Sequence, residues 1–128
     1  ACDASRGSLT ELQTVPTLPE GCPGTNTTCA EIAVHPSGRF VYGSNRGHDS
    51  IAVFRIGEEG RLTRIGLEPS RGQGPQNLLI TPDGKWLLCA NMPGNNVATF
   101  AMDAQSGGLK SVGEPVSIPS PSCIRLLR

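Results

Sequence analysis

Residues 31–54 read EIAVHPSGRFVYGSNRGHDSIAVF, and a degenerate copy, NLLITPDGKWLLCANMPGNNVATF, returns at residues 77–100. The offset between the two copies is 46 residues throughout, so that Pro36 falls on Pro82. A third copy begins with PSCIRLL at residues 121–127, where the apolar positions stay in step. A fixed period of this length indicates stacked supersecondary units that do not stand alone.

Each complete period holds four apolar, β-branched runs separated by turns that contain Pro or Gly. In the first period the runs span residues 31–34, 40–44, 50–56 and 62–67. Pro presets φ and Gly supplies a positive φ in the turns between the first two runs. The 16 Gly, the 11 Pro and the lack of helical spacing agree with an all-β protein. Four short antiparallel strands in such a period are typical of a β-propeller blade.

The predicted fold is therefore an all-β, β-propeller fragment of four-stranded antiparallel blades, with two full blades and a partial blade at each end. The predicted units are a blade end and loop at 1–28 with a strand at 8–15, full blades at 29–74 and 75–120, and an inner strand of a further blade at 121–128, centred on 123–127. The chain does not begin with Met, so we expect it to be a piece of a longer protein. Its exposed blade faces are expected to meet missing N-terminal blades of the same propeller, or a second copy.

Charge and cysteine content exclude several classes of protein. Eleven basic and eleven acidic residues give a formal net charge of zero, and the basic residues are scattered, so neither nucleic acid nor an anionic membrane is an expected partner. No apolar run has the length of a membrane span. The five cysteines favour a reducing, cytoplasmic location over a disulfide framework. Cys22 and Cys29 flank a loop, and two interpretations stay open: they form a disulfide, or they are two small, part-buried thiols.

The topology of a blade divides the polar residues between two ends. In a four-stranded meander, the turn between the second and third strands lies at the same end as the start of the first strand. The residues collected at this end are Arg46, His48 and Asp49 from one turn, and Glu31, Gln76 and Asn77 at the starts of the inner strands. Because the inner strand lines the channel of a propeller, these polar side chains are expected to face a shared cavity.

Glu31 is the most informative position, because its equivalents in the other copies are Asn77 and Cys123. A carboxylate that opens an apolar strand is costly to bury without partners. Two interpretations stay open: a site carboxylate, or a solvated strand end paired with a nearby arginine. Arg46 and His48 are not required by turn geometry, since the second copy has Met and Gly in their places. Each is therefore either a functional side chain or a solvated turn residue.

Arg71, in the short connection between the two periods, is either a further site residue or a solvated loop arginine. Asn45 and Asn91 occur in both copies, which favours a structural duty, and His35 lies at the opposite end of the blade, where a structural role is expected. The chain contains no Gly-x-Ser-x-Gly elbow, His-Glu-x-x-His motif or phosphate-binding glycine loop. We therefore expect no metal and no cofactor.

Three runs carry a resemblance to a known family: AEIAVHPSGRFVYGSNRGHDSIAVF at residues 30–54, GPQNLLITPDGKWLLCAN at 74–91 and PSPSCIRLL at 119–127. They closely resemble the C-terminal part of the lactonase family typified by bacterial 6-phosphogluconolactonase of the seven-bladed propeller type. The resemblance covers nearly the whole chain. It implies metal-independent hydrolysis of a sugar lactone, with 6-phosphogluconolactone in the pentose phosphate pathway as the usual substrate.

By match to the family pattern, the resemblance implies that Glu31 is the acid/base that activates water or handles the ring-oxygen proton. It also implies that Arg46 and His48 bind the substrate or its developing oxyanion, with His48 counted among the catalytic residues. One departure concerns Gln76, because the family usually has Arg after Gly-Pro at this point. The change removes a bidentate anion clamp. Arg71 replaces that substrate-binding arginine only if its loop folds inward.

A second departure is that the blades supplying the other half of such a cavity are absent from these residues, so we expect this fragment alone to be inactive or a poor catalyst. The alternative function is a non-catalytic propeller that serves as a binding or interaction scaffold, because the Tyr-Gly-Ser-Asn blade pattern at residues 42–45 also occurs in propellers that catalyse nothing. A scaffold has no need of Glu31, Arg46 and His48 together at one end.

Overall fold

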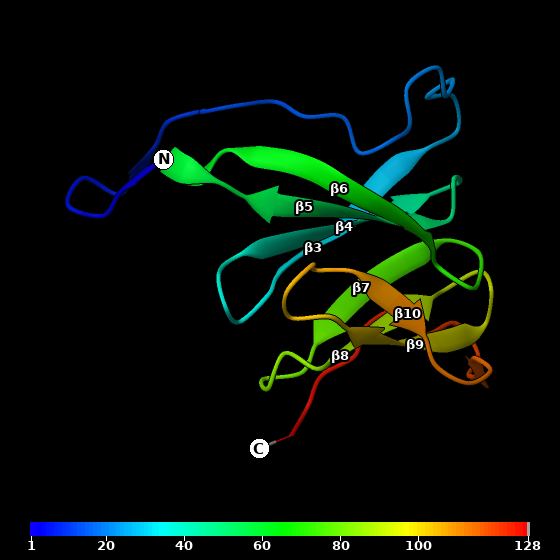
Figure 1. The fold of residues 1–128 in the computed structure, drawn as a ribbon. Helices are drawn as coiled ribbons and strands as arrows, with labels where there is room; N and C mark the ends of the chain where they lie inside the picture. Colours follow the sequence, from blue (N-terminus) through cyan, green and yellow to red (C-terminus); the bar gives the residue numbers. More distant parts are fainter. Residues whose placement is uncertain (128) are drawn as a thin grey trace.

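The computed structural model describes residues 1–127 as two antiparallel sheets that pack face to face (Figure 1). The first sheet has the strand order β3 (Thr28–Val34), β4 (Phe40–Arg46), β5 (Ser50–Ile56) and β6 (Leu62–Pro69). The second has the order β7 (Pro75–Ile80), β8 (Trp86–Asn91), β9 (Asn96–Met102) and β10 (Leu109–Ser111), and β11 (Val116–Ser117) also pairs with β9. A two-stranded hairpin of β1 (Cys2–Asp3) and β2 (Ser8–Leu9) precedes them.

The strands of both sheets follow the repeat of the sequence. The run predicted at 50–56 is β5, and the other three predicted runs of the first period form the body of β3, β4 and β6. Equivalent tight turns join the first two strands of each sheet, and Gly38 and Gly84 both have φ of +70° there. The only helical element among residues 1–127 is a single 3₁₀ turn, η1 (Glu58–Gly60), in the predicted turn between β5 and β6. The all-β blade architecture is confirmed.

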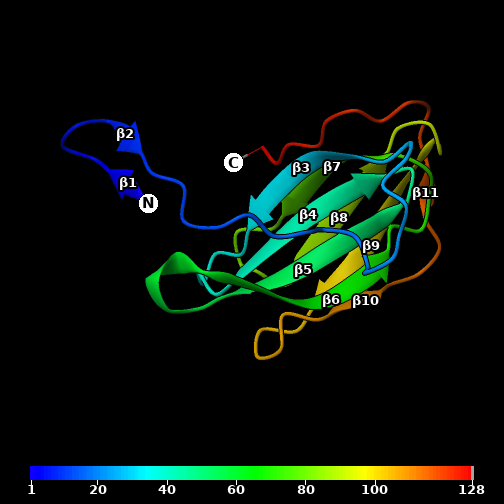
Figure 2. The ribbon, with the colours of Figure 1, turned by 90° about the horizontal axis from the view of Figure 1, so that it is seen from above.

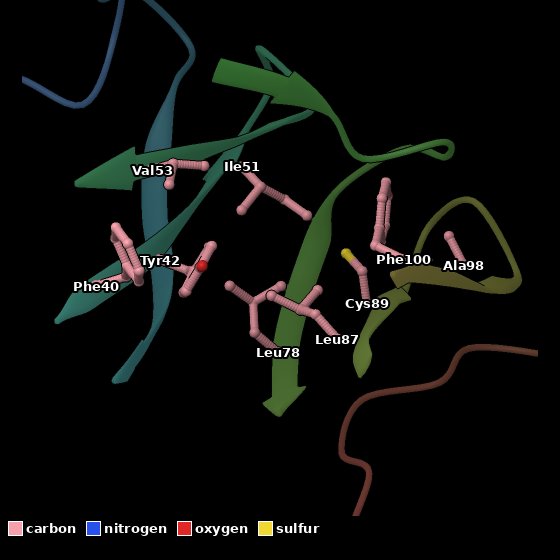
Figure 3. Close-up of a cluster of buried hydrophobic side chains, with 9 residues drawn as sticks. All are labelled: Phe40, Tyr42, Ile51, Val53, Leu78, Leu87, Cys89, Ala98 and Phe100. Atoms are coloured by element: carbon pink, nitrogen blue, oxygen red, sulfur yellow. The ribbon is translucent and has the colours of Figure 1, made fainter. Parts of the chain in front are cut away.

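The main core lies between the two sheets (Figure 3). Each member is at most 5% exposed, and the members are Phe40, Tyr42, Ile51 and Val53 from the first sheet and Leu78, Leu87, Cys89, Ala98 and Phe100 from the second. Burying these side chains removes apolar surface from water, which contributes about 25 cal/mol of stabilising free energy per Å² buried. One shared interface therefore holds both sheets together.

Polar contacts reinforce this interface. The Tyr42 hydroxyl donates to the carbonyl oxygen of Gly107 at 2.8 Å. Nε2 of buried His35 lies 3.0 Å from the carbonyl oxygen of Gly84, and its Nδ1 accepts from the Ser37 backbone N–H at 3.1 Å. The carbonyl oxygen only accepts, so His35 bridges the sheets with a proton on Nε2. Its predicted structural role is confirmed.

The predicted strand at residues 8–15 is wrong beyond its first two residues. Only Ser8 and Leu9 form a strand, and they pair with β1 rather than with a blade. The rest of the segment runs along the outer edge of the first sheet, where the Gln13 side chain exchanges hydrogen bonds of 3.1 and 2.8 Å with the backbone of Leu62. Although β6 lies beside this segment, no described strand exchanges backbone hydrogen bonds with residues 10–15, and strand geometry requires such pairing.

The same reason applies at the other end, where no strand forms over residues 123–127. This segment runs beside β7 and contacts it through one hydrogen bond, from the backbone N–H of Ile124 to Oδ1 of Asn77 at 2.8 Å. Arg128, the last residue of the predicted unit 121–128, lies outside the described residues. Within residues 1–127, no helix has the length and apolar character needed to cross a membrane.

Candidate functional site

The inner strands of the two sheets, β3 and β7, lie side by side (Figure 2). Each contains a register shift at the equivalent place: β3 against β4 between Cys29 and Ile32, and β7 against β8 between Pro75 and Asn77. Such bulges insert an extra residue and redirect side chains. Both register shifts lie at the point where the alternating apolar residues of the inner strand begin. Glu31 therefore sits at an irregular position of its strand rather than in the regular ladder.

Glu31 is half-buried and bonded at both carboxylate oxygens. Its Oε2 accepts from Nδ2 of Asn77 at 2.5 Å, and its Oε1 accepts from the backbone N–H of Ile32 at 3.2 Å. Its own backbone N–H donates to Oγ of Ser44 at 3.0 Å. Among residues 1–127 no arginine pairs with this carboxylate, which is held by two hydrogen bonds instead. It accepts hydrogen bonds only, as an ionised carboxylate does.

A polar cavity of about 430 Å³ opens at the end of the sheets where β3 begins and β4 ends. Residues from four segments line it: Asn26 and Thr28 before and in β3, Arg46, Gly47 and Asp49 at the end of β4 and in the turn after it, Gln73 and Gly74 in the connection that leads into β7, and Pro93 in the turn after β8. Arg46 lies opposite Thr28 in the sheet ladder. The cavity is therefore built by both periods together.

Arg46 supplies the one charged donor of this cavity that lacks a full set of partners. Its Nε is buried and has no hydrogen-bond partner among residues 1–127. A buried N–H of a guanidinium is normally bonded, because leaving it unpaired costs roughly 1–3 kcal/mol. Arg46 also lines the cavity, where its guanidinium is the one positively charged group among the lining residues.

Asp49 organises the loops around the cavity. It has φ of +56°, and its Oδ1 accepts from the backbone N–H of Gly47 at 3.2 Å and of Gly74 at 2.8 Å. One carboxylate thereby ties the turn of the first sheet to the connection that leads into β7. The sequence placed Asp49 at this end without assigning it a role. Its copy in the second period is Asn95, also at positive φ, and that pairing signals a turn function.

His48 does not join Arg46 in the cavity. Its Nδ1 lies 2.8 Å from Oγ of buried Ser50, and it lines a separate cavity of about 140 Å³ with Leu67 and Pro69. Asp49 lies between the two cavities and lines both. The turn therefore presents Arg46 and His48 to opposite sides, which the spacing of the residues in the sequence does not reveal.

The other two candidates also lie outside the Arg46 cavity. Arg71 is exposed, has φ of +63° and forms an ion pair of 3.7 Å with Glu114. Gln76 is half-buried in the bulge of β7. Gln73, four positions before Asn77, reaches the cavity instead. The sequence had no signal for Gln73 or Asn26, because both are placed by irregular loops.

The repeated asparagines have the structural duty that the sequence indicates. Asn45 donates through Nδ2 to the carbonyl oxygen of Thr17 at 3.2 Å and to Oγ of Ser50 at 3.1 Å. Asn91 donates to the carbonyl oxygen of Ser70 at 3.0 Å and to Oδ1 of Asn96 at 2.9 Å. Each therefore joins the connection before its sheet's inner strand to the start of the third strand.

Comparison with known proteins agrees with the blade architecture. The family model described as "Lactonase, 7-bladed beta-propeller" matches residues 1–126. The chain belongs to the seven-bladed β-propeller lactonase family. A 6-phosphogluconolactonase of Bacillus subtilis is 34% identical over 122 residues, which are 94% of this chain and 35% of the relative. The chain thus spans about a third of the length of the curated relatives that it matches.

Solved structures show the same fold as this member of the lactonase family. A protein from Lactobacillus plantarum superposes with a TM-score of 0.94 at 30% identity, over 99% of this chain and 37% of that one. A structure titled periplasmic gluconolactonase, from Pseudomonas aeruginosa, has a TM-score of 0.86 at 30% identity, over 93% of this chain and 33% of that one. Two four-stranded blades of a propeller account for this chain.

Proposed function

We propose that this protein hydrolyses the ester bond of a sugar lactone. The observation that carries the proposal is the match of residues 1–126 to the lactonase family, with Glu31 held by hydrogen bonds on an inner strand. Relatives carry the names 6-phosphogluconolactonase and gluconolactonase, which share this chemistry. In the reaction, water adds to the lactone carbonyl carbon, the bond from that carbon to the ring oxygen breaks, and a hydroxy acid forms.

Glu31 is the proposed general base. Two of the roughly four lone-pair positions of its carboxylate are occupied, by Asn77 and by Ile32, so the remainder are free to accept a proton from water. A positioned base contributes on the order of 10²–10⁴-fold to the rate. The proton then passes to the ring oxygen as it leaves, so no proton is consumed at this stage.

Arg46 is the proposed binder of negative charge. Its buried Nε is unpaired, and a guanidinium stays charged at every physiological pH. A substrate oxygen that becomes more negative during the reaction would be stabilised by the positive charge of Arg46 at the cavity wall. All five candidate site residues stay predictions: Arg46 lines the polar cavity, whereas Glu31, His48, Arg71 and Gln76 do not.

The test is lactone hydrolysis by the protein with all of its blades, using gluconolactone and 6-phosphogluconolactone. We expect Glu31→Gln to lower kcat by about 100-fold or more, and Glu58→Gln, at an exposed turn, to leave it unchanged. Unchanged turnover in Glu31→Gln would sink the assignment of Glu31. If Gln76 weakens phosphate recognition, the unphosphorylated lactone is the better substrate, and Gln76→Arg reverses that order.

We propose further that the chain of 128 residues alone is a poor catalyst, because it covers about a third of its relatives. The proposed partners of its open blade faces are further blades of the same propeller or a second copy. A reducing, cytoplasmic location agrees with five cysteines that form no disulfide among the described residues.

A binding scaffold is the second candidate function, and the separation of His48 from Arg46 favours it. Absence of turnover with every lactone would support that alternative.

A further inference from the structure

Asn77 occupies the position in the second blade that Glu31 occupies in the first. It is 4% exposed, and both ends of its side-chain amide are bonded. Nδ2 donates to Oε2 of Glu31 at 2.5 Å, and Oδ1 accepts from the backbone N–H of Ile124 at 2.8 Å. Three successive copies of the repeat are therefore joined in a row through one amide.

The direction of this amide is fixed by its neighbours. A backbone N–H only donates, so the atom that faces Ile124 has to be the oxygen of Asn77. Its NH₂ group then has to face Glu31. Turning the amide over would set two donors against each other at Ile124 and two acceptors against each other at Glu31, with the loss of both hydrogen bonds.

We propose that Asn77 is a positioning residue that holds the Glu31 carboxylate in the orientation used for hydrolysis. This inference rests on the proposed function. Asn77 fixes Oε2 while the backbone N–H of Ile32 fixes Oε1, so the plane of the carboxylate is set from both sides. A misplacement of about 1 Å in a reacting group lowers rates by roughly 100-fold. The role of Asn77 is therefore geometric, and it touches no reacting atom.

Few other ionisable groups surround the pair. Strand β7 (Pro75–Ile80) has none, and β3 has only Cys29 besides Glu31. Among residues 1–127, the remaining ionisable groups on the elements packed against them are Tyr42, which donates to Gly107, Arg46 in its cavity, the buried Cys89 on β8, and Cys123 and Arg125 in the C-terminal segment. A change of charge at position 77 therefore acts mainly on Glu31.

Asn77→Asp is the decisive variant, because it keeps the shape and the acceptor for Ile124 but replaces the donor with a second carboxyl group. Two adjacent carboxylates share a proton, since both cannot ionise at this separation. We expect kcat to fall on the order of 100-fold near neutral pH with KM nearly unchanged. The acid limb of the pH–rate profile should move to higher pH, so that activity returns partly in alkaline buffer.

Asn95→Asp is the matched control, because it adds the same charge at an exposed position whose copy is already Asp49. It should keep the kcat and pH profile of the parent. Asn77→Leu removes both hydrogen bonds and tests whether the fold tolerates the loss. A purely structural role would lower the melting temperature while leaving the pH profile of the folded fraction in place, and that result would overturn the inference.

A second measurement does not depend on activity. In ¹⁵N-labelled protein, the side-chain NH₂ signals of Asn77 should move in Glu31→Gln, because that variant replaces the accepting carboxylate with an amide, and should stay in place in Glu58→Gln. If the parent hydrolyses no lactone, the proposed function fails, and these signals still decide whether Asn77 holds Glu31. Signals that are the same in the parent and in Glu31→Gln would reject the positioning role even in an active enzyme.

Discussion

The Tyr42 hydroxyl of the first sheet donates a 2.8 Å hydrogen bond to the carbonyl oxygen of Gly107 in the second sheet. Tyr42 is fully buried, and Gly107 is buried beneath the ring of Phe40. No element of secondary structure includes Gly107, so this contact fixes a loop of one blade on the core of its neighbour. The interface between the two blades therefore contains a hydrogen bond as well as apolar packing.

Tyr42→Phe should destabilise the protein by about 1–3 kcal/mol, because it leaves the buried Gly107 carbonyl without a donor. Denaturant unfolding monitored by circular dichroism measures the change. Thr63→Val on the exposed side of β6 is the control and should shift the free energy of unfolding by less than about 0.5 kcal/mol. An equal effect of both substitutions would show that the interface bond adds nothing.

Stability should fall in alkaline solution. Burial, and to a lesser degree the negative charge of Asp103, raises the pKa of Tyr42 from 10.0 to about 12. Burial raises the pKa of Cys89 from 9.0 to about 12. The folded state keeps both protons at a pH where the unfolded chain releases them, so this stabilisation is complete below about pH 9 and is lost as pH rises toward 12. A melting temperature that stays level between pH 9 and 11 would contradict this expectation.

Gly84→Ala and Gly38→Ala form a pair matched by the repeat. Both glycines have φ of +70°, so both substitutions carry the same backbone strain of about 1 kcal/mol. An added Cβ at Gly84 would lie 2.7 Å from Nε2 of His35, whereas at Gly38 nothing lies within 4 Å. We expect Gly84→Ala to be the more destabilising by about 1–3 kcal/mol in thermal or denaturant unfolding. Equal losses would mean that His35 can move aside.

The thiols should divide into two classes. Cys89 is fully buried with a raised pKa, whereas Cys2, Cys29 and Cys123 are exposed and Cys22 is half-buried. Because the thiolate is the reactive form, an aromatic disulfide reagent at pH 8 should leave Cys89 unmodified in the folded protein. Cys89→Ala should then leave the number of native thiols that react unchanged. A reaction of Cys89 without denaturant would place it nearer the surface than we describe.

Arg46→Met should lower kcat/KM for the lactone by about 10- to 100-fold, since a hydrogen bond to a charged group contributes roughly 1.5–3 kcal/mol. The basis of this expectation is that Arg46 lines the polar cavity and is the one positively charged residue of its lining. Arg61→Met is the control, because Arg61 is exposed and bonded to the Leu12 carbonyl away from the cavity. Steady-state kinetics of the two variants in the protein with all of its blades would separate a site effect from a change in charge.

The repeat in the sequence predicts the strands well and the site only in part. Both ends of strand β5 agree with the prediction, because turn residues lie directly before Ser50 and after Ile56. Such residues can be recognised from the local sequence alone. The segments 8–15 and 123–127 were predicted as strands and are not, because a strand also needs a neighbour that local pattern does not reveal.

The site residues also divide into those that the sequence singles out and those that it does not. Comparison of the copies singled out Glu31, and the structure shows it bonded on an inner strand. Arg46 and His48 line different cavities, and the loop that brings Gln73 to the Arg46 cavity has no regular pattern. Such positions are set by loop geometry, which composition and period do not encode.

The contact between Glu31 and Asn77 also bears on how a duplicated sequence diverges. Two copies of a repeat begin identical, and here equivalent positions of adjacent copies touch each other at 2.5 Å. A glutamate in both would bring two carboxylates together and force one to take up a proton. The symmetry of the duplication therefore has to break at this point before a carboxylate can be kept ionised there. A blade acquires its chemistry by becoming unlike its neighbour.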